Sequence, residues 1–315
     1  MSFIRTVKGD VPIESLGLML PHEHLFVDLR GPLAEGYGQG EPQAVSDLLQ
    51  PYLDHAQALG VTALVDCGPI GVGRNIAVLR HLANITPIHI IAPTGIYKEA
   101  FIPPDKFGHT AEQLAAEWVD EITTGIDGSE SRAGFIKVAV SDDGPTPLEV
   151  RNLQAAVLAS RSTGATVGCH TIGGAAALQN LAVLEAAGHD MHRFIWIHAH
   201  TELDTQVHIE AARRGIYLEF DAIGAVNWHP QDKLLQSVLA LLEAGWVNQI
   251  LLSHDAGWYE PGQPGGVPAG GMRGYTALIE NFIPQLRANG ISETVIHQLT
   301  VTNPARAMAF LPVPP

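Results

Sequence analysis

Cysteine and long apolar segments are both scarce in this chain. Only Cys67 and Cys169 occur among 315 residues, so the sequence indicates no disulfide framework and favours a reducing compartment. No run approaches the roughly 20 apolar residues of a transmembrane helix, and residues 1–5 lack the apolar core of a signal peptide. We therefore expect a cytoplasmic protein that does not interact with membranes.

Positive charge is scarce as well. The chain has 18 lysine and arginine residues against 33 aspartate and glutamate residues, a formal net charge of −15, and no basic tract. A surface of this sign repels nucleic acid and anionic lipid, so neither is an expected partner. Hydrophobic residues make up 46% of the chain, which is ample for a large buried core. The charge favours solubility and does not by itself identify a substrate.

Short apolar, β-branched runs alternate with helical patterns along the chain, and most of these helices end in a glycine. The runs predict parallel strands at residues 16–24, 61–68, 89–95, 135–140, 166–170, 194–198, 216–221 and 249–255. Eight strands alternating with helices predict an α/β fold, the (β/α)8 TIM barrel, with residues 1–315 as a single domain. The alternative is a doubly wound sheet, but no glycine-rich phosphate loop follows the first strand.

Three local features qualify this pattern. Pro51 is expected to kink or split the helix predicted at residues 43–59. The segment 258–274 is rich in glycine and proline and is expected to form a mobile loop over the barrel mouth. A final helical region, residues 275–310, is expected to pack on the outside of the barrel.

The predicted strands end in residues that bind metals. His22 and His24 are two positions apart, so on a strand their imidazoles point to the same side. Alone the pair means little, since 15 histidines in 315 residues give about 0.7 such pairs by chance. Barrel closure, however, brings all strand ends around one mouth. The other candidates there are Lys137, His170, His198 and Asp255.

Four imidazoles and one carboxylate exceed the needs of a single tetrahedral zinc ion. They suit two metal ions roughly 3.5–4 Å apart, a binuclear centre at the C-terminal face of the barrel. Such a centre needs one more bridging anion. Lys137 can belong to it only if the amine is neutral or chemically converted to an anion.

This combination resembles the phosphotriesterase family of the amidohydrolase superfamily. The segments Ser253–Tyr259 and Thr302–Arg306 also look like signatures of that family. The resemblance implies a role for Lys137, which would react with CO2 to form a bridging carbamate. It implies a metal-ligand set at the strand ends, comprising His22, His24, Lys137, His170, His198 and Asp255.

The resemblance implies a metal-dependent hydrolase acting on ester bonds, a phosphotriesterase-like lactonase with possible side activity on organophosphate triesters. Two divalent metal ions are implied, zinc or alternatively cobalt, manganese or iron, bridged by carboxylated Lys137 and hydroxide. Asp255 would be the catalytic residue that takes the proton of the attacking hydroxide. The expected partners are a small ester, lactone or organophosphate and, by analogy with relatives, a second copy in a homodimer.

Several other functions stay open. The chain could be a dedicated phosphotriesterase (an aryldialkylphosphatase) or another carboxylester hydrolase, because one site geometry serves both. A barrel that binds metal without catalysis is a further alternative, although no ligand of the metal set is missing. Glycoside hydrolysis would require two carboxylates at the mouth and no metal.

The substrate pocket is expected to include Tyr97, Trp258 and Met272. Tyr97 is similar to the tyrosine that lactonases place beside the bound lactone, where phosphotriesterases tend to have tryptophan. Trp228 is another candidate for the pocket wall. Each of these residues could equally be an ordinary packing residue.

The chain departs from the family pattern at two strand ends. Ala222 follows Asp221 where the family often has a basic residue, and the acidic relay of phosphotriesterases is replaced by the run Ala199-His200-Thr201. His200 is therefore an outer partner of the metal ligands, a substrate contact or plain polar lining. Glu219 and Asp221 share one face of their strand and could orient water or a ligand histidine.

Two residues next to predicted ligands are expected to be structural. His254 should point away from Asp255, and Cys169 should be a small buried residue rather than a nucleophile. For the metals, the resemblance implies that His22 and His24, with Asp255 and Lys137, hold the more buried ion. The remaining two histidines would hold the more exposed ion.

Overall fold

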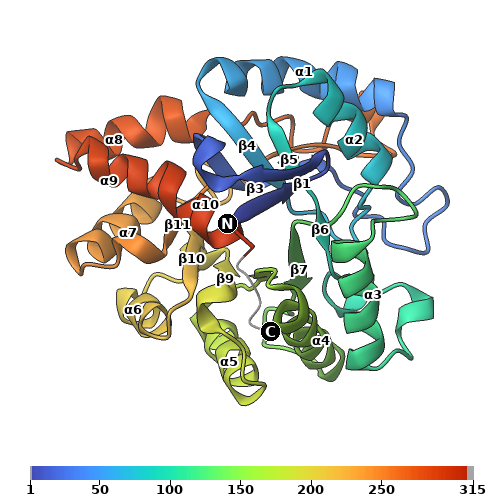
Figure 1. The fold of residues 1–315 in the computed structure, drawn as a ribbon. Coiled ribbons are helices and arrows are strands. Elements are labelled where there is room, and N and C mark those ends of the chain that lie inside the picture. Colours follow the sequence, from blue (N-terminus) through green and yellow to red (C-terminus); the bar gives the residue numbers. More distant parts are fainter. Residues whose placement is uncertain (1, 311–315) are drawn as a thin grey trace.

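The computed structural model of the protein describes residues 2–310 and shows a ring of helices around a barrel of strands (Figure 1). In chain order the barrel strands are β3 (Leu18–Phe26), β4 (Val61–Asp66), β5 (His89–Ile91) with β6 (Pro93–Thr94), β7 (Phe135–Ala139), β8 (Val167–His170), β9 (Phe194–Ile197), β10 (Tyr217–Phe220) and β11 (Ile250–Leu252). Every pairing between neighbouring barrel strands is parallel. These strands occupy the eight predicted positions, so the (β/α)8 prediction is confirmed.

The strands form two hydrogen-bonded sheets that meet at two seams. One sheet has the order β11-β10-β9-β8-β7-β6, and the other has the order β12-β3-β4-β5. At the first seam β5 and β6 are two halves of one strand, interrupted at Ala92. At the second seam β3 lies beside β11, where the Asp255 amide donates to the His22 carbonyl at 3.1 Å.

Seven helices surround the barrel. They are α1 (Pro42–Ala58), α2 (Ile76–Ile85), α3 (Ala111–Thr123), α4 (Pro147–Thr163), α5 (Gly174–Ala186), α6 (Thr205–Arg213) and α7 (Gln231–Glu243). Side-chain caps start four of them, α2, α3, α4 and α6. Capping boxes formed by Thr110 with Gln113 and by Thr146 with Glu149 start α3 and α4. Gly164, in the left-handed conformation at φ 76°, ends α4.

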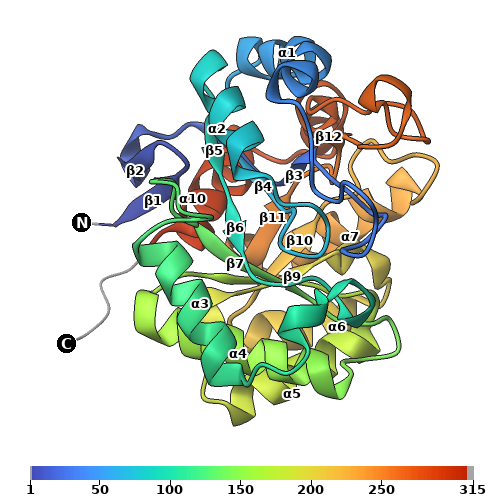
Figure 2. The same cartoon turned by 90° about the vertical axis from the view of Figure 1, so that its right-hand side faces the viewer.

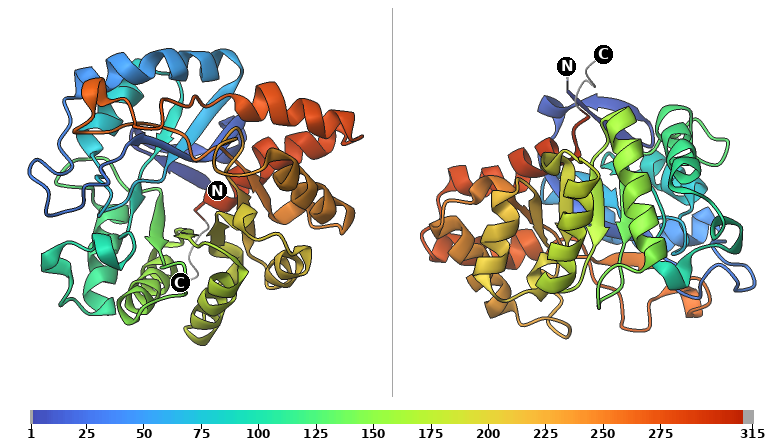
Figure 3. Two further views of the ribbon diagram at one scale, coloured as in Figure 1. Left: turned by 180° about the vertical axis from the view of Figure 1, so that it is seen from behind. Right: turned by 90° about the horizontal axis from the view of Figure 1, so that it is seen from below.

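Two predicted features differ in the structure. Helix α1 continues without interruption through Pro51, so the predicted split is wrong; Pro51 is solvent-exposed. The segment after β11 is not wholly a loop, because β12 (Gly257–Tyr259) pairs in parallel with β3. The rest of this segment crosses the face of the barrel seen in Figure 3, left.

The C-terminal region divides into short helices with different positions. Helices α8 (Ile283–Ala288) and α9 (Glu293–His297) lie on the outside of the barrel, as predicted. Helix α10 (Asn303–Met308) instead covers the N-terminal end of the barrel, where Ala307 and Met308 join the interior cluster. The prediction that residues 275–310 pack only on the outside is therefore wrong for α10.

A hairpin of β1 (Phe3–Thr6) and β2 (Gly9–Pro12), which was not predicted, lies beside α10 (Figure 2). Phe3 pairs with Phe310 through an antiparallel bridge, and their rings stack with centroids 5.2 Å apart. The hairpin and α10 thus close the N-terminal end of the barrel. Among residues 2–310, no helix combines the length and apolar composition that crossing a membrane would require.

Alternating residues along the strands divide the apolar core into two parts. Residues facing outward, such as Ile136 and Val138 of β7, pack against the helices. Residues facing inward fill the barrel in layers, and they include Met19, Phe135, Ile195 and Leu251. On β7 and β11 the next inward positions toward the mouth are the buried polar residues Lys137 and Ser253, so the site there lies directly on this packed interior.

Glu23 ties the first barrel strand to the end of the last one. Its buried carboxylate accepts hydrogen bonds from the Ser253 hydroxyl at 2.8 Å and from the His254 and Ala256 amides, both at 3.2 Å. Nδ1 of His254 lies 2.5 Å away from the same carboxylate. Backbone pairing between β3 and β11 is sparse, so the hydrogen bonds of the Glu23 side chain supply much of the contact between these two strands.

Glu23→Gln should therefore weaken barrel closure. The amide would turn an N–H donor toward backbone N–H groups and leave buried donors without an acceptor, so the free energy of unfolding should fall by about 2–4 kcal/mol. Urea unfolding of the metal-free protein measures this change. Glu14→Gln, at an exposed position, is the matched control, and an equal loss in both variants would contradict the role of Glu23.

Candidate metal centre

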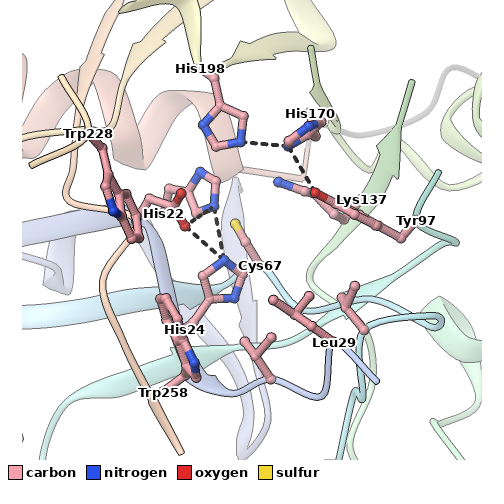
Figure 4. Close-up of a pocket in the computed structure, with 13 residues that line it drawn as sticks. His22, His24, Leu29, Cys67, Tyr97, Lys137, His170, His198, Trp228 and Trp258 are labelled. Carbon is pink, nitrogen blue, oxygen red and sulfur yellow. Dashed lines mark hydrogen bonds and ion pairs between the residues drawn. The ribbon is translucent and has the colours of Figure 1, made fainter. Parts of the chain in front are cut away.

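The predicted ligands meet at the C-terminal mouth of the barrel (Figure 4). Three of them continue the inward-facing alternation of their strands. Lys137 follows Phe135 on β7, His170 ends β8, and Asp255 lies four residues beyond the inward-facing Leu251. Strand alternation therefore accounts for Lys137 and His170, whereas Asp255 lies beyond the end of β11 on a left-handed backbone, at φ 49°.

His22 and His198 reach the mouth through irregular backbone. The pairing of β3 with β4 shifts register between Leu20 and Glu23, and this irregularity changes the direction in which the His22 side chain points. Strict alternation would place His198 on the side opposite to Ile197. His198 instead adopts the left-handed conformation, at φ 67°, which turns its ring into the barrel.

Three donor atoms form one group in the mouth. Nε2 of His22 and Nε2 of His24 are 3.3 Å apart. Oδ1 of Asp255 lies 3.4 Å from the first nitrogen and 3.0 Å from the second. Two ligands that are each about 2.0–2.2 Å from one tetrahedral ion lie roughly 3.3–3.6 Å apart. The two separations from His22 fall in this range and the third, 3.0 Å, is slightly shorter, so the three atoms are close enough to share an ion.

A second group lies beside the first. Nε2 of His198 and Nδ1 of His170 are 2.7 Å apart, and the Tyr97 hydroxyl is 3.2 Å from the latter nitrogen. The groups are continuous, because donor atoms of His22, His198 and Asp255 all lie within 4.8 Å of one another. The donors thus form a triplet and a pair that adjoin each other at His198.

Asp221 orients two of these histidines. Its buried carboxylate lies 2.7 Å from Nδ1 of His22 and 3.0 Å from Nδ1 of His198. A carboxylate that accepts from Nδ1–H fixes the tautomer in which Nε2 carries its lone pair toward the cavity. Asp221 therefore orients both rings with Nε2 toward the cavity, the orientation that a metal ligand requires.

The electrostatics favour a neutral His22 beside an ionised Asp221. Burial, reinforced by the Lys137 ammonium, lowers the pKa of His22 to about 3. Burial alone would raise the pKa of Asp221, but the electrostatic effect of His198 and His22, with hydrogen bonds from His198 and His200, holds it well below its ordinary value. Neutral imidazole is the form that binds a metal, so His22 is ready as a ligand at neutral pH.

Glu219 is a second buried carboxyl group near His22, and its pKa is shifted in the direction opposite to that of Asp221. Burial, followed by the charge of Asp221, raises the pKa of its carboxyl group well above the ordinary value. Its Oε2 is 3.7 Å from Nδ1 of His22, and neither oxygen has a hydrogen-bond partner among the described residues. Asp221 is thus the closer carboxylate to His22, and Glu219 is a buried carboxyl beneath it.

Lys137 has an unusual environment for a lysine. It is 2% exposed and lines the cavity together with all five other predicted ligands. Within residues 2–310, no carboxylate oxygen lies within 4.0 Å of its amine. Gly95, at φ 105°, packs so tightly on the Lys137 carbonyl that any side chain there would collide with it.

The ligands open into a cavity of about 200 Å³. Tyr97, Trp228 and Trp258 line it, as the sequence predicted. Met272 lines neither this cavity nor the adjacent cavity around Trp228 and Trp258. Its side chain packs against the hydrophobic core, so the prediction that Met272 lines the substrate pocket is wrong. The remaining wall was not predicted and is formed mainly by apolar residues, namely Val27, Leu29, Cys67 and Val72.

The three residues of uncertain role are now placed. Nδ1 of His200 lies 2.9 Å from Oδ1 of Asp221, so His200 touches the partner of the ligands rather than the cavity. His254 points away from the mouth and accepts a hydrogen bond from the Leu278 amide at 2.9 Å. Cys169 is fully buried, and burial raises the pKa of its thiol to about 12, which does not suit a nucleophile.

Three supporting residues had not been identified from the sequence. Glu23 and Ser253 hold the ends of β3 and β11, and the Ser253 hydroxyl accepts from the His22 amide at 3.0 Å. Arg273 donates to the carbonyl oxygens of His254 and Asp255. The alternation of β11 places Ser253 inside the barrel, but no local signal marks Glu23 or Arg273.

Comparisons with known proteins agree with this geometry. The model of the phosphotriesterase family matches residues 2–308. The phosphotriesterase homology protein of Escherichia coli (strain K12) is 32% identical over 297 residues, covering 92% of this chain and 97% of that protein. The aryldialkylphosphatase of Saccharolobus solfataricus is 26% identical over 310 residues, covering 95% and 97%.

A solved structure extends the likeness to the fold. A variant of the PTE-like lactonase of Deinococcus radiodurans is 31% identical to this chain and superposes with a TM-score of 0.89. The match covers 97% of this chain and 99% of that chain. The chain is thus similar to these proteins along nearly its whole length.

Asp221→Asn should weaken metal binding. The asparagine amide would present N–H groups to the Nδ1–H of one histidine, so at least one ring would lose its fixed orientation. We expect a 10–100-fold loss of metal affinity, the usual cost of removing such a partner. Competition with a chromogenic chelator measures it, with the exposed Asp232→Asn in α7 as control; equal affinities in the two variants would contradict the role of Asp221.

Proposed function

The chain belongs to the phosphotriesterase family, and from this premise we propose that it is a lactonase that works with two divalent metal ions. As a family member it is a metal-dependent hydrolase acting on ester bonds. The proposal adds its preferred substrate, a lactone, with slower hydrolysis of organophosphate triesters. The observation that carries it is one small cavity in which the ligand donors and the Tyr97 hydroxyl face the same space.

The residues present suit a binuclear centre. His22, His24 and Asp255 would hold one ion and His170 with His198 the other, with Lys137 carboxylated between them. Zinc is our first choice, and cobalt, manganese and iron also suit imidazole and carboxylate ligands. When bound, the two ions would supply a Lewis acid for the scissile group and lower the pKa of the attacking water toward ~7.

Asp255 is placed to move the proton of the reaction. Its side chain is 25% exposed, while Oδ1 remains within 3.4 Å of both histidines of its group. Although burial opposes it, the charges of His22 and His24 lower the pKa of Asp255 below the ordinary range. The carboxylate would accept the proton of the attacking water at an oxygen atom and pass it to the leaving alkoxide.

Tyr97 is placed to orient a carbonyl substrate. Burial raises the pKa of its hydroxyl above the ordinary value, so the group stays protonated and can donate. With Nδ1 of His170 engaged as a ligand, the Tyr97 proton is available to an oxygen of the lactone. A hydrogen bond aimed at the oxygen on which charge develops stabilises the transition state.

The size of the cavity favours a lactone. At about 200 Å³ it is below the roughly 300–1,000 Å³ of typical ligand pockets. One wall is apolar and consists of Val27, Leu29 and Val72. A flat ring with a single carbonyl suits such a space better than a tetrahedral phosphorus atom with three substituents.

A dedicated phosphotriesterase, or another carboxylester hydrolase, is the second candidate. A neighbouring cavity of about 400 Å³ shares Leu29, Trp228 and Trp258 with the first one, and it could take the larger leaving group of an aryl triester. The likeness to an aryldialkylphosphatase supports this alternative. The same ligand set would serve both reactions.

Comparison of kcat/KM for a panel of lactones and for aryl dialkyl phosphates decides between the two. We expect the best lactone to exceed the best triester by about 100-fold or more, and Tyr97→Phe to lower lactone turnover by about 10–100-fold through loss of its donor. Tyr52→Phe, at a half-buried position in α1, is the matched control. Faster triester cleavage together with an unaffected Tyr97→Phe variant would favour the second candidate.

Lys137→Met tests the bridging carbamate. Methionine keeps the volume of the side chain but cannot react with CO2, so the metal content should fall from about two ions per chain to one or fewer. Elemental analysis measures the content, and 13C NMR after growth with labelled bicarbonate should show a carbamate signal in the wild-type protein alone. The exposed Lys233→Met serves as control; two ions in Lys137→Met would remove the carbamate from the proposal.

A further inference from the structure

The backbone that carries Asp255 is in a conformation that side chains rarely adopt. Asp255 has φ 49°, Gly257 has φ 89° and Trp258 has φ 70°. Among residues 2–310 only two other non-glycine residues, Asp127 and His198, have positive φ. For non-glycine residues such as Asp255 and Trp258 this backbone is strained and persists only where the surroundings fix it.

Two charged side chains hold this segment from opposite sides. Glu23 accepts hydrogen bonds from the backbone amides of His254 and Ala256, which flank Asp255. Arg273 donates from Nη2 to the carbonyl of His254 at 3.2 Å and to the carbonyl of Asp255. The peptide groups on both sides of Asp255 are therefore fixed by charged side chains. Glu23 binds their N–H groups, and Arg273 binds their C=O groups.

The same guanidinium group reaches a second element of the mouth. Cζ of Arg273 lies 4.5 Å from the ring centroid of Trp228, a cation–π contact. Trp228 belongs to the loop between β10 and α7 and lines both cavities, and its side chain is otherwise largely exposed. Arg273 thus joins the segment that carries Asp255 to the loop that carries Trp228.

We propose that Arg273 is a positioning residue that sets the orientation of the Asp255 carboxylate through the two backbone carbonyls. The proposal rests on the proposed function, because it takes Asp255 to be a metal ligand. Arginine suits this role, since its planar fork can donate to two carbonyls while its face stacks on an aromatic ring. A lysine ammonium could replace the charge and one hydrogen bond, but it could not make both carbonyl hydrogen bonds and also stack on Trp228.

The expected consequence is specific to the metal site. Without the guanidinium, the Asp255 peptide can relax from its left-handed conformation, and Oδ1 moves away from Nε2 of His22 and His24. Misplacement of a ligand by about 1 Å is enough to lower affinity and turnover strongly. The rest of the barrel, including the Asp221 contacts, does not involve Arg273.

Cobalt-loaded protein provides the test, because its visible absorption bands depend on the ligands around the ion. Arg273→Met should change these bands and shorten the half-time of cobalt loss to a chelator by about 10-fold or more. Arg273→Lys should give an intermediate half-time, and it supplies the measurement if Arg273→Met does not fold. Trp228→Leu removes the aromatic contact and keeps the carbonyl contacts, so it should retain cobalt like the wild type.

The outcomes separate the two proposals. Unchanged bands and a half-time within twofold of the wild type in both Arg273 variants would overturn the positioning role while leaving the metal centre intact. Equal cobalt loss in Trp228→Leu and Arg273→Met would also overturn it, because the effect would then not pass through the carbonyls. Failure of the wild-type chain to take up cobalt would overturn the proposed function itself.

Discussion

The site depends first on the buried carboxylate of Asp221, which lies close to Nδ1 of His22 and Nδ1 of His198. Those two rings come from β3 and from the end of β9, and they belong to different donor groups. A single anion therefore sets the orientation of one ligand in each half of the proposed centre. The anion is stable in its buried position only because the imidazoles donate to it, so the ligands and their support require each other.

Strand alternation accounts for what the sequence could predict. Finding the strands was enough to place Lys137 and His170 in one mouth, whereas Asp255 lies beyond β11 on a left-handed backbone. His198 lies at the mouth because its backbone is left-handed, and no propensity rule selects histidine for that conformation. Glu23 could not be identified because its partner Ser253 is more than two hundred residues away in sequence. Arg273 is fewer than twenty residues from Asp255, but it lies in an irregular loop, where the distance along the sequence does not predict a contact. Met272 was misplaced because a position in an irregular loop has no alternation to guide it.

The two departures from the family pattern have structural counterparts here. Ala222, which replaces the usual basic residue, is buried and places no positive charge next to Asp221. His200, which replaces an acidic residue, directs its ring to Asp221, on the side away from the cavity. The region around Asp221 is therefore richer in imidazole and poorer in charge than the resemblance implied, while the ligand set itself is complete.

The seam between β3 and β11 also constrains the order in which the chain can fold. The contacts that close it, from Glu23 and from the His22 amide, span about 230 residues of sequence. During synthesis the first barrel strand must wait, with one edge unpaired, until nearly the whole chain has been made. An open strand edge invites pairing with another chain. Slow expression or chaperone assistance should therefore improve the yield of this protein more than any change to its already dense core.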